Sequence, residues 1–154
     1  MEMSEGSTLH PIVARAREAF RAQACSILVH EPESRLLVFA AVSGEGSESL
    51  VGLKIPDSAG VAGWVLANRE PLLLEDVAHD RRFAEDIAEI IGYLPRRMMA
   101  MPLLLEARVL GVLEVLDCPE QAKVAETGQL GRFADEAVRA LARLGPRDVS
   151  SETP

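Results

Sequence analysis

The sequence predicts an α+β domain built on a central antiparallel sheet of five to six strands. Three observations predict it: amphipathic helical segments stand near both ends of the chain, two strand–turn–strand patterns lie between them, and short helical segments separate those patterns. With 154 residues, 48% of them hydrophobic and 26% charged, the chain can fill one sizeable core. We expect the terminal helices on one face of the sheet and the short helices and loops on the other.

The N-terminal part reads as a helix followed by a hairpin. Residues 25–30 and 36–42 have strand-like patterns joined by turn residues, and residues 50–55 predict an edge strand that ends before Pro56. An apolar stripe with the helical period predicts the helix that precedes them: Leu9, Ile12, Val13, Ala16 and Phe20.

The middle of the chain predicts short elements: a helix over residues 59–68, a strand over 72–74 and a second helix that ends at Gly92. Residues 56–97 contain three Pro and three Gly. Helices of about ten residues are marginal in water on their own, so tertiary contacts or a ligand must hold these in place.

The C-terminal part predicts strands over residues 97–105 and 109–117 and a helix over 124–144. Both strands are apolar on both faces, which is typical of central strands covered on each side. A single domain over residues 7–145 is expected, with disordered polar tails at 1–6 and 146–154.

Several segments in the middle of the chain together resemble the core of a GAF domain, the small sensor module of bacterial signalling proteins. They are Gly60-Val61-Ala62-Gly63-Trp64, Glu75-Asp76-Val77, Asp80-Arg81-Arg82-Phe83, Met98-Met99-Ala100-Met101-Pro102-Leu103 and Leu110-Gly111-Val112-Leu113-Glu114-Val115-Leu116. The resemblance covers roughly residues 8–143. It implies a GAF-like (profilin/PAS-like) fold and a non-enzymatic sensor or regulatory role in signal transduction.

The resemblance also implies a ligand pocket between the sheet and the middle helices, where GAF domains bind cyclic nucleotides, haem, bilins or small anions. A movable cover over an apolar chamber would suit sensing, whereas a chamber filled by native side chains would count against it. Core packing is the simpler role for each lining residue. The residues expected to bind the ligand are Trp64, Phe83, Ile87, Ile90, Tyr93, Met99 and Met101.

Polar candidates for such a pocket are few. Glu114 interrupts an apolar strand, and a buried carboxylate needs a partner, so it forms an ion pair, lies at an exposed sheet edge or contacts a ligand. Arg96 and Arg97 could bind an anion or simply be solvated.

The motifs that known chemistries of GAF domains require are absent from this sequence. Asn68 is followed by Arg69 where cyclic-nucleotide-binding members have Asn-Lys, and neither Cys25 nor Cys118 precedes the His of bilin-binding members. Free methionine sulfoxide reductases use three cysteines, and this chain has two. No metal-ligand spacing is present either. We therefore expect no catalytic residues and no metal site, and the cofactor stays unknown.

Three functions remain open: a sensor of an unidentified small molecule, a ligand-free interaction or dimerisation module, and a thiol-dependent redox enzyme. A homodimer through the terminal helices and a signalling protein partner are expected. Nucleic acid is not, because the net charge is −8 without a basic run. The longest apolar run has eight residues and no signal peptide is evident, so we expect no membrane binding and a cytoplasmic location.

Overall fold

In the computed structural model, six strands of the described residues, 5–44 and 47–145, form one antiparallel sheet. They are β1 (Ala24–Glu31), β2 (Leu36–Gly44), β3 (Lys54–Pro56), β4 (Leu72–Leu74), β5 (Met98–Leu105) and β6 (Arg108–Leu116). The helices are α1 (Glu5–Phe20), α2 (Ser47–Leu50), α3 (Gly60–Asn68), the 3-10 helix η1 (Val77–His79), α4 (Ala84–Ile91), α5 (Gln121–Thr127) and α6 (Gln129–Leu144).

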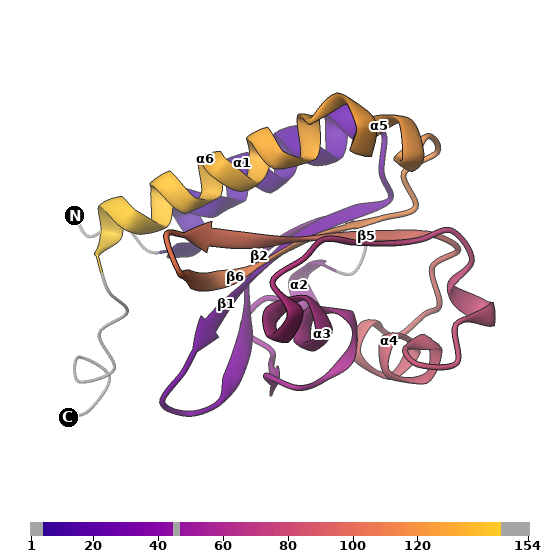
Figure 1. Cartoon of the computed structure of the whole chain (residues 1–154), viewed down its shortest axis with the longest axis horizontal. Coiled ribbons are helices and arrows are strands. Elements are labelled where there is room, and N and C mark those ends of the chain that lie inside the picture. The colour runs from indigo at the N-terminus through magenta and orange to yellow at the C-terminus, as the bar shows by residue number, and fades with distance from the viewer. Residues whose placement is uncertain (1–4, 45–46, 146–154) are drawn as a thin grey trace.

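The strand order is β3-β2-β1-β6-β5-β4, so the two long hairpins lie side by side in the centre. The terminal helices α1 and α6 cover one face, and α3 and α4 cover the other (Figure 1). The predicted fold class and the predicted placement of the helices are confirmed.

The face under α1 and α6 holds the larger apolar cluster. The predicted stripe of α1 is fully buried in it, and α6 contributes Leu130, Ala134, Ala137, Val138, Ala140 and Leu141. The two helices also contact each other, because Phe20 meets Phe133 edge to face at 5.4 Å and Arg15 pairs with Glu136. Burying each large apolar side chain contributes roughly 1.5–3 kcal/mol. Both stripes therefore stabilise the interior of one chain.

Two predicted elements were wrong in detail. The helix predicted over 124–144 starts at Gln121 and is broken into α5 and α6, because Gly128 adopts φ 77°. The edge strand predicted over 50–55 is reduced to β3, because α2 ends at Leu50 and Gly52 turns the chain at φ 90°. Helix α1 already begins at Glu5, and the rest of the predicted tails lies outside the described residues.

Helix α3 packs closely against its own preceding loop. A Cβ on Gly63 would lie 2.4 Å from the carbonyl carbon of Ser58, so only glycine fits there. Gly60, the first residue of the helix, adopts φ 59°, a conformation that favours glycine. The two glycines of α3 therefore have two different roles.

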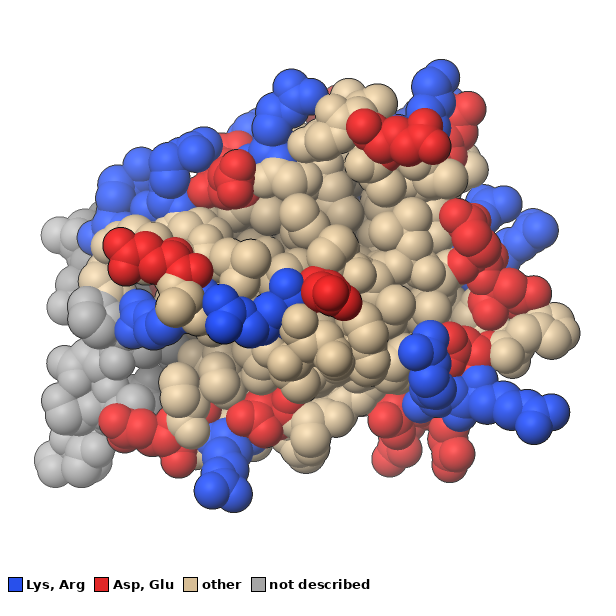
Figure 2. Space-filling view, in the orientation of Figure 1, with Lys and Arg blue, Asp and Glu red and all other residues tan. Residues whose placement is uncertain are grey.

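The surface carries charges of both signs. Lys and Arg side chains alternate with Asp and Glu side chains around the face shown in Figure 2. Across residues 5–44 and 47–145, no helix has both the length and the apolar composition that crossing a bilayer requires.

Candidate ligand site

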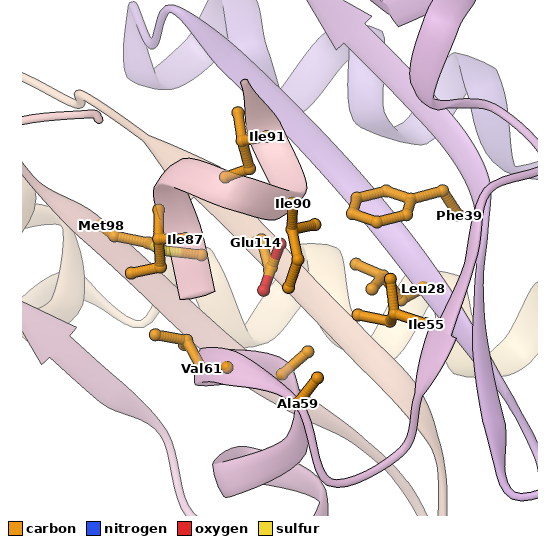
Figure 3. A pocket seen from close by; sticks show the side chains of 12 residues that line it. Leu28, Phe39, Ile55, Ala59, Val61, Ile87, Ile90, Ile91, Met98 and Glu114 are labelled. Atoms are coloured by element: carbon orange, nitrogen blue, oxygen red, sulfur yellow. The ribbon is translucent and has the colours of Figure 1, made fainter. Parts of the chain in front are cut away.

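A small cavity lies between the sheet, α3 and α4 (Figure 3). Its volume is about 10 Å³, which is room for roughly one water molecule. The spacious chamber expected from the sequence is therefore almost filled in this conformation. The lining residues are Leu28, Phe39, Ile55, Ala59, Gly60, Val61, Ala62, Ile87, Ile90, Ile91, Met98 and Glu114.

The structure brings only some of the predicted binding residues to this cavity. Ile87 and Ile90 line it, and Phe83 is buried in the same apolar cluster beside them. Trp64 is half-buried and lines a shallow neighbouring groove together with Phe83. Tyr93 follows the end of α4, is 41% exposed and is not among the lining residues.

The expected place of Met99 and Met101 was wrong. Both side chains face α1 and α6, on the opposite side of the sheet from the cavity. Met98 and Ala100 face α3 and α4 instead, and Met98 lines the cavity. Side chains alternate along a strand, so choosing the other row of β5 moves every member to the other face.

Glu114 lies on the floor of the cavity. It stands on β6 between two cross-strand neighbours, Ser26 of β1 and Ala100 of β5, and is 5% exposed. Its carboxylate points into the space between Ile87 and Ile90 of α4 (Figure 3). Burial therefore excludes the sheet-edge exposure that the sequence left open.

Burial raises the pKa of Glu114 from its ordinary value of 4.5 to about 7, and a hydrogen bond with the Ser26 hydroxyl lowers it only in part. The other described residues that line the cavity have no ionisable side chain. None of the ion pairs found in the described part of the chain involves Glu114. The arrangement can accept hydrogen bonds from a donor or pair with a cation.

Helix α4 covers this carboxylate and is attached to the domain by a small set of contacts. Ile87 is its one buried residue, at 2% exposure. The backbone N–H of Gly60, at the start of α3, donates to the Asp86 carboxylate at 3.3 Å. An eight-residue helix with one buried side chain is the kind of element that opens locally at low free-energy cost.

Both ends of α4 are defined by local interactions. The Asp80 carboxylate accepts hydrogen bonds from the N–H groups of Arg82 and Phe83, at 2.9 and 3.2 Å. The Arg82 guanidinium also binds this carboxylate and lowers the pKa of Asp80. At the other end Gly92 adopts φ 92° and its N–H bonds the Ala88 carbonyl, which ends the helix as predicted. These contacts define the two ends of α4, and the middle of the helix covers the cavity.

The other polar candidates lie away from the cavity. The backbone N–H groups of Arg96 and Arg97 both donate to the Asp117 carboxylate, at 2.8 and 2.9 Å. The Arg97 side chain lies 3.7 Å from a carboxylate oxygen of Glu75. These residues fix the beginning of β5 beside the end of β6.

The two cysteines are free thiols in the core. Cys25 and Cys118 are 0% and 1% exposed and belong to the cluster beneath α1 and α6. Burial raises the pKa of both thiols, that of Cys25 to about 12. Because the thiolate is the reactive form, such thiols are poor nucleophiles.

Comparison with known proteins agrees with this architecture. The chain superimposes on the GAF domain of an Acinetobacter phosphoenolpyruvate-protein phosphotransferase with a TM-score of 0.76 and 22% identity, covering 96% of this chain and 89% of that one. It is also similar to free methionine-R-sulfoxide reductase from Neisseria meningitidis in complex with its substrate, with a TM-score of 0.68, 24% identity and coverage of 88% and 78%.

A probable 3',5'-cyclic phosphodiesterase from Caenorhabditis elegans is 30% identical over 76 residues, which are 49% of this chain and 10% of that protein. The matched region thus spans a small part of this relative. The family profile described as GAF domain matches residues 5–143. With nearly all of the described residues inside this match, the chain belongs to the GAF domain family.

Proposed function

We propose that this chain is a non-enzymatic regulatory sensor domain, in which α4 moves outward to admit a small ligand and then covers it in the enlarged cavity between α4 and the sheet. The observation that carries the proposal is Glu114, a carboxylate buried in an apolar cavity beneath a short helix. A buried carboxylate without a cation destabilises the closed form, so the chain retains a group that a ligand could satisfy.

The sheet offers a physical route from this cavity to the terminal helices. Along β5, Met98 faces the cavity while its neighbour Met99 packs under α1 and α6. Because packed interiors do not deform freely, a shift of β5 and β6 on one face would change the packing on the other. The ligand signal would reach a partner through α1 and α6.

A homodimer through the terminal helices belongs to the same proposal. The apolar stripes of α1 and α6 are already buried within one chain, so a second copy would contact their outer faces. On α6 these faces expose Arg132, Asp135 and Arg139. Opposite charges on neighbouring copies would then determine the register of the two helices. We also expect a signalling protein partner and a cytoplasmic location.

The burial of both thiols supports a non-enzymatic role. A redox enzyme of the methionine sulfoxide reductase type needs accessible, ionisable cysteines. The raised pKa values of Cys25 and Cys118 oppose that chemistry.

A second candidate function is a ligand-free interaction module. The small volume of the cavity, about 10 Å³, favours it, because native side chains occupy the space a ligand would need. The two candidates differ in whether α4 moves to admit a guest.

Hydrogen exchange of residues 84–91 would test the proposal against a panel of amines, amino acids, short-chain acids and nucleosides. A ligand at a hundred times its Kd stabilises the domain by about 2.7 kcal/mol and slows exchange in α4. The variant Ala59→Leu, which adds volume inside the cavity, should lose the response, whereas Ala67→Leu on the exposed face of α3 should keep it. If no compound slows the exchange and α4 is already as protected as β6, the interaction module is correct.

A further inference from the structure

The chemistry of the cavity defines the class of ligand it would take. Resting on the function proposed above, we propose that the ligand is an aliphatic ammonium compound: its cationic head pairs with Glu114, and its apolar body takes the place of the Ile90 side chain beneath α4. The head and the body are each supported by a separate feature of the site.

The first feature is the capacity of the Glu114 carboxylate to accept hydrogen bonds. An ionised carboxylate has about four acceptor positions, and the Ser26 hydroxyl supplies one hydrogen bond. The carboxylate lies between Ile87 and Ile90, whose side chains have no donors (Figure 3). An ammonium group has three donors and would form charge-assisted hydrogen bonds, which are about twice as strong as neutral ones.

The second feature is the absence of competing charge among the described residues around Glu114. Its strand neighbours are Ser26 and Ala100, and the residues of α3 and α4 that line the cavity are Ala59, Gly60, Val61, Ala62, Ile87, Ile90 and Ile91. Asp86, a charged residue of α4, accepts the N–H of the lining residue Gly60. An anionic ligand would therefore meet a lone carboxylate without a cation to neutralise it, whereas a cation would meet the only ionised group of the described lining.

The third feature is the apolar wall. Ten of the twelve lining residues have alkyl, aromatic or thioether side chains, and the exceptions are Gly60 and Glu114. Such walls suit an unbranched or branched hydrocarbon body and offer no donor or acceptor for a sugar or a nucleobase. The site thus combines one anionic contact with an aliphatic lining.

The proton equilibrium of Glu114 gives this inference a specific signature. The pKa of the carboxyl is about 7 in the closed form, so an ammonium ligand must displace a proton at lower pH. At about pH 6 roughly one tenth of the carboxyl groups are ionised and at about pH 8 roughly nine tenths, so affinity should rise about tenfold between them.

The test uses three unbranched six-carbon probes: n-hexylamine, 1-hexanol and hexanoate. Binding is followed by NMR of the methyl groups of Ile87, Ile90 and Met98, at about pH 6 and about pH 8 and at physiological salt. The variant Glu114→Gln removes the charge from the floor of the cavity. Glu89→Gln, at an exposed position of α4, removes the same charge from the surface and serves as the matched control.

We expect hexylamine to shift the cavity methyl signals of the wild type and of Glu89→Gln. Its affinity should rise about tenfold from pH 6 to pH 8 and fall at least tenfold in Glu114→Gln. Hexanol should bind more weakly, with no dependence on pH over this range. If Glu114→Gln fails to fold, the pH dependence of hexylamine affinity in the wild type tests the inference alone.

The inference is overturned if hexanol or hexanoate binds as tightly as hexylamine, or if hexylamine binds with no dependence on pH. It is also overturned if hexylamine leaves the three methyl signals unchanged. In each case the exchange experiment on residues 84–91 still decides the proposed sensor function, because a compound of another class that protects α4 would support that function alone.

Discussion

Replacing Glu114 with Gln should remove a defined part of the pH dependence of folding. The folded domain holds the Glu114 proton more tightly than the unfolded chain, because burial raises its pKa from 4.5 to about 7. A group of this kind lowers the free energy of unfolding as the pH rises from about 4.5 to about 7, and the loss then stays constant. At 1.36 kcal/mol per pH unit, the loss is about 3 kcal/mol, of which about 2.5 kcal/mol falls between pH 5 and pH 8.

Urea unfolding of the wild type, Glu114→Gln and Glu89→Gln at about pH 5 and about pH 8 measures this contribution. Comparing the change with pH, rather than the absolute stability, cancels the constant effect of a buried amide and the titration of all other groups. From pH 5 to pH 8, the free energy of unfolding of the wild type should fall by about 2.5 kcal/mol more than that of Glu114→Gln. Glu89→Gln should follow the wild type, because its carboxylate is exposed.

Equal changes in the wild type and Glu114→Gln would refute the reasoning. That result would mean that the carboxylate is solvated or paired in solution, and that α4 does not close the cavity as described. A larger change in Glu114→Gln than in the wild type would contradict the sign of the pKa shift itself.

Three further perturbations test other parts of the structure. Gly63→Ala should destabilise the domain by more than about 2 kcal/mol in urea unfolding, because its Cβ would overlap the backbone of the preceding loop. Gly131→Ala in α6, whose Cβ would lie 3.5 Å from the terminal methyl carbon of Met101 in an ordinary contact, should be neutral or stabilise by up to about 1 kcal/mol. Cys25 should react with iodoacetamide at about pH 8 far more slowly in the folded protein than in urea; equal rates would contradict its burial. Asp86→Ala should speed amide exchange in α4, because it removes the acceptor of the Gly60 N–H and so lowers the free energy of opening the helix by about 1 kcal/mol. Unchanged exchange would show that this hydrogen bond does not hold the helix.

The terminal helices and the central hairpins could be predicted because their patterns are long and have one clear period. The stripe of α1 follows the helical period over about three turns and is buried as a unit. The break in the C-terminal helix was missed, although Gly128 stood in the sequence, because the residues on both sides of it are helical. A glycine within a periodic segment does not by itself distinguish a tolerated residue from a left-handed turn.

Which row of β5 side chains faces the cavity could not be predicted, because both rows are apolar. Met98 and Met99 are equally hydrophobic, so alternation identifies two rows without indicating which one faces α4. The answer depends on pairing with β6, where Met98 stands opposite Leu116 and Met99 opposite Val115. This pairing is a tertiary property, and a shift of one residue would have reversed the result.

Glu114 was visible in the sequence as a carboxylate within an apolar strand, but its surroundings were not. Its hydrogen-bond partner, Ser26, is 88 residues away along the chain and becomes a neighbour only when β1 pairs with β6. The volume of the cavity is equally non-local, because Ile90 can line a chamber or fill it depending on how far α4 stands from the sheet.

A closed cavity need not prevent sensing, but it limits affinity. If the form with α4 displaced makes up about 1% of the molecules, a ligand that binds only this form shows an apparent Kd about a hundredfold weaker than its intrinsic value. Glu114 alters that balance in a way that depends on the ligand. Closing α4 over a purely apolar guest leaves the carboxylate without a cation, whereas closing it over an ammonium group forms the pair. The same residue that destabilises the closed, empty domain would thus favour closure over one class of ligand, so the free energy of moving α4 and the selectivity of the site have a common origin.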